Sequence, residues 1–222
     1  MAKYADSDPY VDIRTGVLRN LLGCRTQEEL DRAEAEIVYI RMSALGRQPV
    51  PGRFDSTHLR AIHKLMFGPI YDWAGQFRTV GISRDGSMFC APAHIESSAI
   101  DLFKSLARES FLARLDQPAF TGRAAHYLGE LNALHPFREG NGRTQREFIR
   151  TLALHNGFEI NWEGISQTEM TVASIAAFHG KSQPLADLIA PHILPAEPYR
   201  QAIEDGVSAQ VASADEGAER EL

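Results

Sequence analysis

The stretch LNALHPFREGNGRTQREF, residues 131–148, decides how this chain folds, because a glycine-rich turn separates two helical patterns there. The turn is Gly-Asn-Gly at 140–142, and its glycines allow positive φ angles that direct backbone N–H groups toward one point. The start of the following helix adds partial positive charge at that point. Arg143 and Arg146 stand about one helical turn apart, so both guanidiniums can reach the same anion. This pattern predicts a binding site for a polyphosphate.

Two ionisable side chains precede the turn. Glu139 comes directly before it and can hold a hard cation such as Mg²⁺ while phosphates supply further oxygen ligands. His135 ends the preceding helical pattern, and an imidazole accepts a proton near neutral pH. The set suggests transfer of a nucleotidyl or phosphoryl group to a hydroxyl. Spacing alone leaves an alternative open, in which the arginines form only the solvated basic face of a helix.

Helical periodicity dominates the rest of the chain. The segment 79–91, TVGISRDGSMFCA, is the exception, because β-branched residues before an Asp-Gly step are typical of a β-hairpin. The expected fold class is therefore mainly α, a bundle of about seven helices with one hairpin. Capping boxes at Thr26–Glu29 and Ser166–Glu169 predict the starts of the first and sixth helices, and Asp55 predicts the start of the second. The third helix is expected to begin at about Ser97 and to carry Phe111 on its apolar side, and the fourth to begin near Pro118. The fifth is expected after 140–142 and the seventh over 182–190.

Length and composition predict one globular domain with extensions. We divide the 222 residues into an N-terminal helical extension over 1–54, a catalytic domain over 55–195, and a flexible tail or linker over 196–222. The tail is rich in Ala, Ser, Asp, Glu and Gly, a composition that cannot bury much apolar surface.

Charge and cysteine content narrow the function. A formal net charge of −6 argues against a broad grip on nucleic acid or an anionic membrane. Cys24 and Cys90 cannot form a disulfide scaffold, and the first residues lack the apolar core of a secretory signal. We expect a cytoplasmic protein, with export by a route that leaves no N-terminal mark as an open alternative. The histidines outside the motif show no metal-binding spacing, and His63 and His126 are expected at core or boundary positions.

The motif resembles that of a known family. Residues 135–146 match HPFx[DE]GNGRxxR, the signature of the Fic (Fido-domain) family, at every specified position. The segment 71–78, YDWAGQFR, is similar to the family's WAGxxR segment, and 79–91 looks like its β-hairpin flap over the active site. The resemblance covers about 10–195, and the opening of the chain most resembles bacterial Fic toxins of the VbhT type, which are paired with a small antitoxin.

The resemblance implies a Mg²⁺-dependent protein adenylyltransferase, which moves AMP from ATP to a Ser, Thr or Tyr hydroxyl of a target protein. His135 would deprotonate that hydroxyl, and Glu139 would hold Mg²⁺ between the α- and β-phosphates. Arg143 would contact the β-phosphate and Arg146 the γ-phosphate. The ATP-binding residues implied are Gly140, Asn141 (backbone and side chain), Gly142, Arg143 and Arg146, with Arg84 and Asp85 of the flap as further candidates.

The same resemblance suggests partners. Many Fic proteins inhibit themselves through an [ST]xxxE[GN] helix, whose Glu pairs with the second arginine of the motif. Glu precedes Gly here at Glu139, Glu163 and Glu216, and the residues four positions earlier are His135, Glu159 and Ala212, neither Ser nor Thr. We therefore expect a separate small antitoxin to supply a Glu to Arg146. The target would add a strand to the flap at 79–91, and by analogy type II topoisomerases are candidate targets.

Two other functions stay open at this point. Other Fic proteins move phosphate, UMP or phosphocholine, although the intact Gly-Asn-Gly at 140–142 favours AMP. A non-catalytic module could instead use the flap only to dock a protein, and such a module would tolerate loss of His135.

Overall fold

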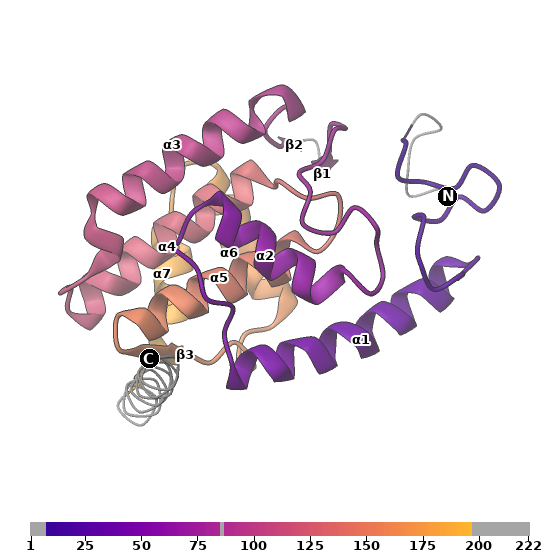
Figure 1. Ribbon diagram of the computed structural model, residues 1–222. Coiled ribbons are helices and arrows are strands. Elements are labelled where there is room, and N and C mark those ends of the chain that lie inside the picture. Colours follow the sequence, from indigo (N-terminus) through magenta and orange to yellow (C-terminus); the bar gives the residue numbers. More distant parts are fainter. Residues whose placement is uncertain (1–7, 85–86, 197–222) are drawn as a thin grey trace, which may run out of the picture.

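The computed structural model describes residues 8–84 and 87–196, and within them the chain folds as a helical bundle (Figure 1). The mainly α fold predicted from periodicity is confirmed. The α-helices of the described chain are α1 Gln27–Arg47, α2 Ser56–Phe67, α3 Ile95–Arg108, α4 Gln117–Leu134, α5 Asn141–His155, α6 Gln167–Phe178 and α7 Gln183–Ile189.

The two central helices are α4 and α5, which pack against each other on either side of the motif's turn. Helix α2 packs on α5, and α6 and α7 both pack on α4. In the view of Figure 1, α1 and α3 run along opposite edges of the bundle, and α1 packs on α2. The glycine-rich turn therefore opens a helix that its neighbours hold firmly.

Local sequence signals start most of these helices. Thr26 and Ser166 each form a complete capping box, as predicted. The Asp55 side chain accepts a hydrogen bond from the N–H of His58 at the start of α2. Helix α3 begins at Ile95, slightly before the predicted Ser97.

The expected place of Phe111 on the third helix is wrong. Helix α3 ends at Arg108, and Phe111 lies in a separate 3₁₀ turn, Ser110–Leu112. Ser110 and Phe111 adopt positive φ angles of 53° and 55°, which a right-handed helix cannot contain.

The predicted hairpin is present but short. Strand β1, Ser83–Arg84, pairs antiparallel with β2, Ser87–Met88, so the paired part is narrower than 79–91. A second small sheet was not predicted. In it β3, Phe158–Ile160, pairs antiparallel with β4, Ile193–Pro195, and this pairing returns the chain to the end of α5. Strands this short carry no alternating pattern that a sequence could display.

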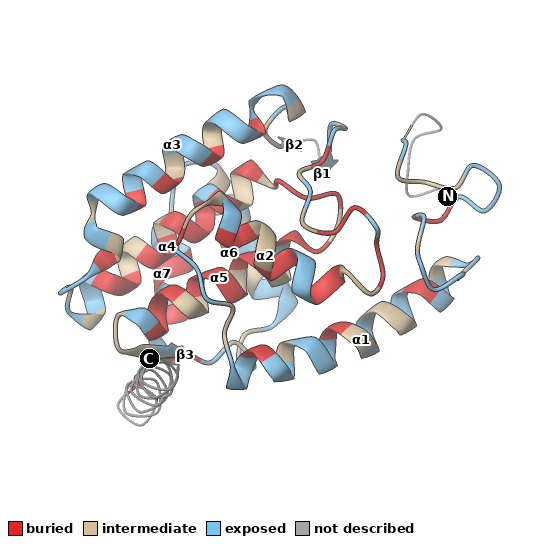
Figure 2. Ribbon diagram, in the orientation of Figure 1, coloured by how far each residue is buried: buried red, intermediate tan, exposed pale blue. Residues whose placement is uncertain are grey.

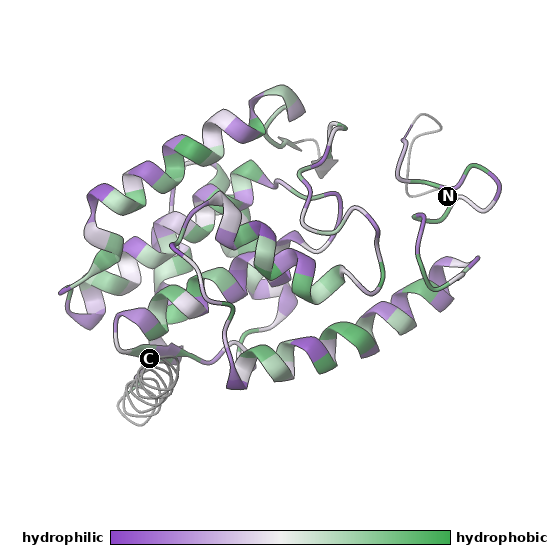
Figure 3. Ribbon diagram, viewed as in Figure 1, coloured by the Kyte–Doolittle hydropathy of each residue, from purple (hydrophilic) through white to green (hydrophobic). Residues whose placement is uncertain are grey.

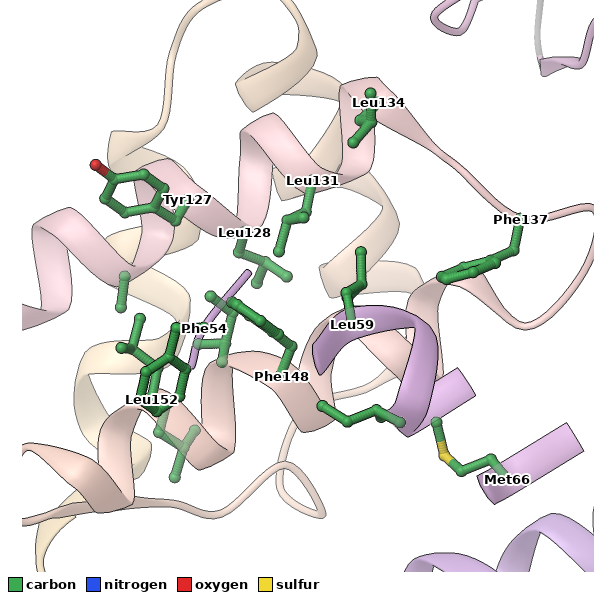
Figure 4. Close-up of a cluster of buried hydrophobic side chains, with 14 of the residues drawn as sticks. Phe54, Leu59, Met66, Tyr127, Leu128, Leu131, Leu134, Phe137, Phe148 and Leu152 are labelled. Atoms are coloured by element: carbon green, nitrogen blue, oxygen red, sulfur yellow. The ribbon is translucent and has the colours of Figure 1, made fainter. Parts of the chain in front are cut away.

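The core lies between α2, α4 and α5, where Figure 2 shows most of the buried residues and Figure 4 shows their side chains. Leu59, Leu131, Phe148 and Leu152 are at most 1% exposed and come from all three helices. The helices carry both hydrophobic and hydrophilic residues, as Figure 3 shows, and the hydrophobic ones fill this interior. No helix within the described ranges is both long and apolar enough to cross a bilayer.

Residues of the N-terminal extension belong to the same core, because Leu30, Val38 and Leu45 of α1 are buried in it. The domain boundary between residues 54 and 55 stays a prediction. The predicted tail lies outside the described residues except for Ala196, whose N–H donates to the carbonyl of Gly157.

Candidate active site

The glycine-rich turn is built around Gly140, which precedes α5 with a φ of 79°. A Cβ on Gly140 would lie 2.4 Å from two ring carbons of Phe67, so both the backbone angle and the packing require glycine. The buried Asn141 side chain closes the turn. Its Oδ1 accepts from the N–H of Phe137 at 2.8 Å, and its Nδ2 donates to the Phe137 carbonyl at 2.7 Å. The resemblance implies that this side chain also holds phosphate, which stays a prediction; in the structure the amide makes these two contacts within the loop.

His135 follows the last residue of α4 in a left-handed conformation, with φ 44° and ψ 58°. Its N–H donates to the carbonyl of Leu131 at 3.0 Å. The half-buried ring stacks on Phe89, with 3.9 Å between centroids and 12° between planes. Phe89 directly follows β2, so the imidazole contacts the base of the flap.

Arg78 connects His135 to the flap through hydrogen bonds to backbone carbonyls, a role that sequence reasoning missed. Its Nε donates to the carbonyl of His135 at 2.8 Å, and its two Nη atoms donate to the carbonyls of Val80 at 2.7 Å and Cys90 at 2.6 Å. The side chain is buried, and burial lowers the pKa of the guanidinium. The only available signal was its place as the last residue of the YDWAGQFR segment.

His63 supports the other side of the turn. Its Nε2 donates to the carbonyl of Glu139 at 3.0 Å, while its Nδ1 accepts from the N–H of Gly75 at 2.9 Å. The ring stacks on Phe137 with 3.9 Å between centroids. Burial lowers the pKa of His63 to about 4, which keeps the ring neutral with the proton on Nε2. The core position predicted for this histidine is confirmed.

The two motif arginines project from the first turns of α5. The Nη2 atom of Arg143 donates to Glu34 Oε1 at 2.5 Å and lies 3.6 Å from Glu139 Oε1. Arg146 Nη1 lies 3.4 Å from where a Cβ on Gly142 would be, so its guanidinium lies over the turn. Within residues 8–84 and 87–196 no carboxylate pairs with Arg146. Burial and then the Arg143 charge lower the pKa of Arg146, which marks a site short of negative charge.

These groups share one cavity of about 810 Å³, a volume suited to a small-molecule ligand. The structure thus brings together every motif residue predicted from the sequence. The far wall is formed mostly by α6, which sequence reasoning did not assign to the site. Of the flap candidates, Asp85 lies outside the described residues and the side chain of Arg84 is not described. The motif residues that line the cavity are His135, Glu139, Gly140, Asn141, Gly142, Arg143 and Arg146, and residues facing them include Met42, Trp162, Met170, Ile175 and Phe178.

Glu139 is the candidate cation ligand. Its side chain is 32% exposed, and its Oε1 accepts from the N–H of Gly140 at 3.0 Å. The described residues contain no group of three or more His, Cys, Asp or Glu able to hold a metal ion. One carboxylate oxygen beside a phosphate site fits Mg²⁺, which binds proteins through one or two carboxylates and takes other ligands from phosphates and water.

The start of α5, the His135 ring and the guanidiniums of Arg143 and Arg146 all line this cavity. The fold and the cavity are therefore typical of the class of proteins that bind a nucleotide by its phosphates at a helix N-terminus.

Comparisons with known proteins identify the family within that class. The sequence profile described as "Fic/DOC family" matches residues 53–153. "Probable protein adenylyltransferase y4lH" of Sinorhizobium fredii is 38% identical, over 84% of this chain and 96% of its own length. The chain belongs to the Fic/DOC family. "Protein adenylyltransferase VbhT" of Bartonella schoenbuchensis is 50% identical over 85% of this chain, which spans only 40% of that longer relative.

Solved structures agree with this assignment. The BepC protein of Bartonella tribocorum with bound AMPPNP has a TM-score of 0.77 and 27% identity, covering 84% of this chain and 96% of that one. An N-terminal Fic domain from Bartonella quintana with bound ADP has a TM-score of 0.77 and 29% identity, covering 86% and 97%. The hairpin-bearing Fic fold expected from the sequence is confirmed.

Proposed function

We propose that this chain is a protein adenylyltransferase that moves AMP from ATP to a hydroxyl of a target protein. The observation that carries the proposal is that His135 and the turn at 140–142 line the same cavity as Arg143 and Arg146. The names of the relatives and the nucleotides bound to the two Bartonella structures support it.

In this reaction His135 accepts the proton of the target hydroxyl while the hydroxyl oxygen attacks the α-phosphorus of ATP. The new O–P bond forms as the bond to the β-phosphate oxygen breaks, and pyrophosphate leaves with that electron pair. The His135 ring is oriented by stacking on Phe89 and by the hydrogen bond that Arg78 donates to the His135 carbonyl. The helix N-terminus and the two arginines stabilise charge that grows on the phosphates.

Glu139 would hold Mg²⁺ in this mechanism, with phosphate oxygens and water completing the coordination. The bound ion would neutralise phosphate charge and favour departure of pyrophosphate. His63 supports this arrangement, because its bond to the Glu139 carbonyl restrains the backbone from which the carboxylate projects.

The flap is the proposed docking site of the target. In the flap Ser83 pairs with Met88 and Arg84 pairs with Ser87. This two-stranded pairing leaves an edge to which an extended segment can add as a strand. Met88 is 67% exposed there and offers an apolar contact. Type II topoisomerases remain candidate targets, and contacts of Arg84 and Asp85 with the nucleotide remain predictions.

Regulation in trans is a further part of the proposal. A separate small antitoxin would supply a Glu to Arg146, for which the described chain holds no carboxylate partner. We place the reaction in the cytoplasm of the producing bacterium or of a recipient cell, which suits the two free cysteines, Cys24 and Cys90. The chain purified alone should then be active, addition of the antitoxin should inhibit it, and the Arg146→Ala variant should bind the antitoxin more weakly.

The test of the activity is label transfer. Purified chain, Mg²⁺ and a bacterial lysate are incubated with ATP labelled at the α- or the γ-phosphate, and adducts are identified by mass spectrometry. We expect protein labelling from the α-label only and its loss in His135→Ala, with His126→Ala, in the helix α4 that precedes His135, as the matched control. Labelling from the γ-phosphate would indicate phosphate transfer, and a retained cellular effect of His135→Ala would indicate a docking module.

A further inference from the structure

Helix α1 contributes a carboxylate that pairs with Arg143 of the cavity, although this helix precedes the residues 53–153 that match the family profile. Glu34, in the middle of α1, accepts a hydrogen bond from Arg143 through Oε1 at 2.5 Å. The Glu34 side chain is only 12% exposed and that of Arg143 26%, so the pair is largely shielded from water. A shielded, charge-assisted hydrogen bond holds its partners more firmly than a surface pair.

Glu34 is itself held from its other side. The hydroxyl of Tyr71 donates to Glu34 Oε2 at 2.5 Å. The Tyr71 ring is buried and stacks on Trp73, with 4.4 Å between centroids and 19° between planes. The carboxylate thus lies between an aromatic cluster and the arginine and accepts a hydrogen bond on each oxygen.

Only one Nη of Arg143 takes part in this contact. The guanidinium also lies over the Phe67 ring, 4.8 Å from its centroid, and that ring packs against Gly140 of the turn. Arg143 is therefore held by one edge and one face, while it lines the cavity. Its remaining N–H groups are available to an anion there.

The charges around Arg143 favour the same interpretation. Arg146 lies close enough for the Arg143 charge to lower its pKa. The Glu34 carboxylate offsets part of that repulsion from outside the turn, and so helps keep two guanidiniums at one site. The Glu34 carboxylate has two hydrogen-bond partners, Arg143 and Tyr71, so it is suited to hold Arg143 in place rather than to compete with a triphosphate for it.

We propose that Glu34 is a positioning residue, which holds Arg143 by one edge so that the opposite edge meets the second phosphate of the nucleotide. The inference rests on the proposed function, because it takes the ligand to be a nucleoside diphosphate or triphosphate. It makes the N-terminal helix a working part of the nucleotide site.

The test compares ligands with and without the second phosphate. Isothermal titration calorimetry with Mg²⁺ measures Kd for ADP and for AMP in the wild type, Glu34→Ala and Glu34→Gln. We expect Glu34→Ala to weaken ADP about tenfold, the size of one charge-assisted hydrogen bond, and to leave AMP within about twofold. Glu34→Gln should stay within about threefold for ADP, because its amide oxygen can still accept from Arg143.

Two controls keep the result interpretable. Glu28→Ala removes an exposed carboxylate of the same helix, paired with Arg32 at 3.0 Å, and should change neither Kd. In an Arg143→Ala background, Glu34→Ala should cause no further loss of ADP binding. Should Glu34→Ala be too unstable to measure, Glu34→Gln takes its place in the Arg143 cycle, where its loss of ADP binding should disappear in the Arg143→Ala background.

Three outcomes would overturn the inference. Unchanged or tighter ADP binding by Glu34→Ala would show that the carboxylate competes with phosphate. Equal weakening of ADP and AMP would indicate a general distortion of the cavity. Absence of ADP binding by the wild type would overturn the proposed function as well, which distinguishes that failure from the other two.

Discussion

Replacing Arg78 by Met tests whether one buried guanidinium holds both the base and the flap. The methionine fills a similar apolar volume but donates no hydrogen bonds, so the carbonyls of His135, Val80 and Cys90 lose their donor together. Arg78→Lys restores the charge at a single point, which cannot match three carbonyls arranged around a planar fork.

The expected loss of stability follows from these three contacts. A buried carbonyl without a donor costs about 1–3 kcal/mol. The three residues are half-buried, so water can reach part of each group and the lower end applies, about 3 kcal/mol in all. That is a large part of the 5–15 kcal/mol typical of a domain, yet it leaves the protein folded at low temperature. Transfer should fall further, about 100-fold in kcat, because the His135 ring loses its alignment.

Urea unfolding gives the change in stability, and AMP transfer is measured where the variant is more than nine-tenths folded. Arg123→Met is the matched control, since Arg123 is 39% exposed and pairs with Glu109 at the surface, and it should cost less than about 1 kcal/mol. The reasoning is refuted if Arg78→Met unfolds at the same urea concentration as the control and keeps wild-type transfer. We expect Arg78→Lys to lie between the two.

Three further predictions concern the core, the turn and the cation. Burial lowers the pKa of His58 below 6.5, so the unfolded chain binds that proton more readily than the folded one. Stability to urea should therefore fall below pH 6.5, with His58 contributing up to about 1.4 kcal/mol per pH unit and His63 acting in the same direction. His58→Gln should reduce that acid slope and leave the part that comes from His63. Gly140→Ala should abolish transfer and lower stability by more than Gly157→Ala does. Gly157 also has a φ of 79°, but a Cβ there would meet open space, so Gly157→Ala isolates the backbone cost of roughly 1–2 kcal/mol. Chelation with EDTA should stop transfer, and Glu139→Gln should raise the Mg²⁺ concentration for half-maximal rate at least about tenfold while AMP binding without Mg²⁺ stays unchanged.

Local signals explain how much of the fold was predictable. Capping boxes at Thr26 and Ser166 and the cap at Asp55 act over three or four residues, so the sequence displays them directly. The turn at 140–142 was equally readable, because its glycines indicate a positive φ, which Gly140 has. These features need no knowledge of distant neighbours.

Contacts between distant segments explain what the sequence did not reveal. Glu34 and Arg143 are 109 positions apart, and Arg78 and His135 are 57 apart, so no periodicity relates either pair. The pairing of β3 with β4 is hidden for another reason, since strands of three residues show no alternation. The composition of α6, which lines the cavity, points to no particular chemistry, and only packing against α4 assigns this helix to the site.

The pairing of β3 with β4 also separates two ends of the molecule in a way that experiments can use. The strands lie at the far end of α5 from the turn, and that helix of 15 residues is roughly 22 Å long. Leu194 in β4 is 54% exposed. A dye attached through Leu194→Cys, with Cys24 and Cys90 replaced by Ser, could report the arrival of a labelled ATP by energy transfer.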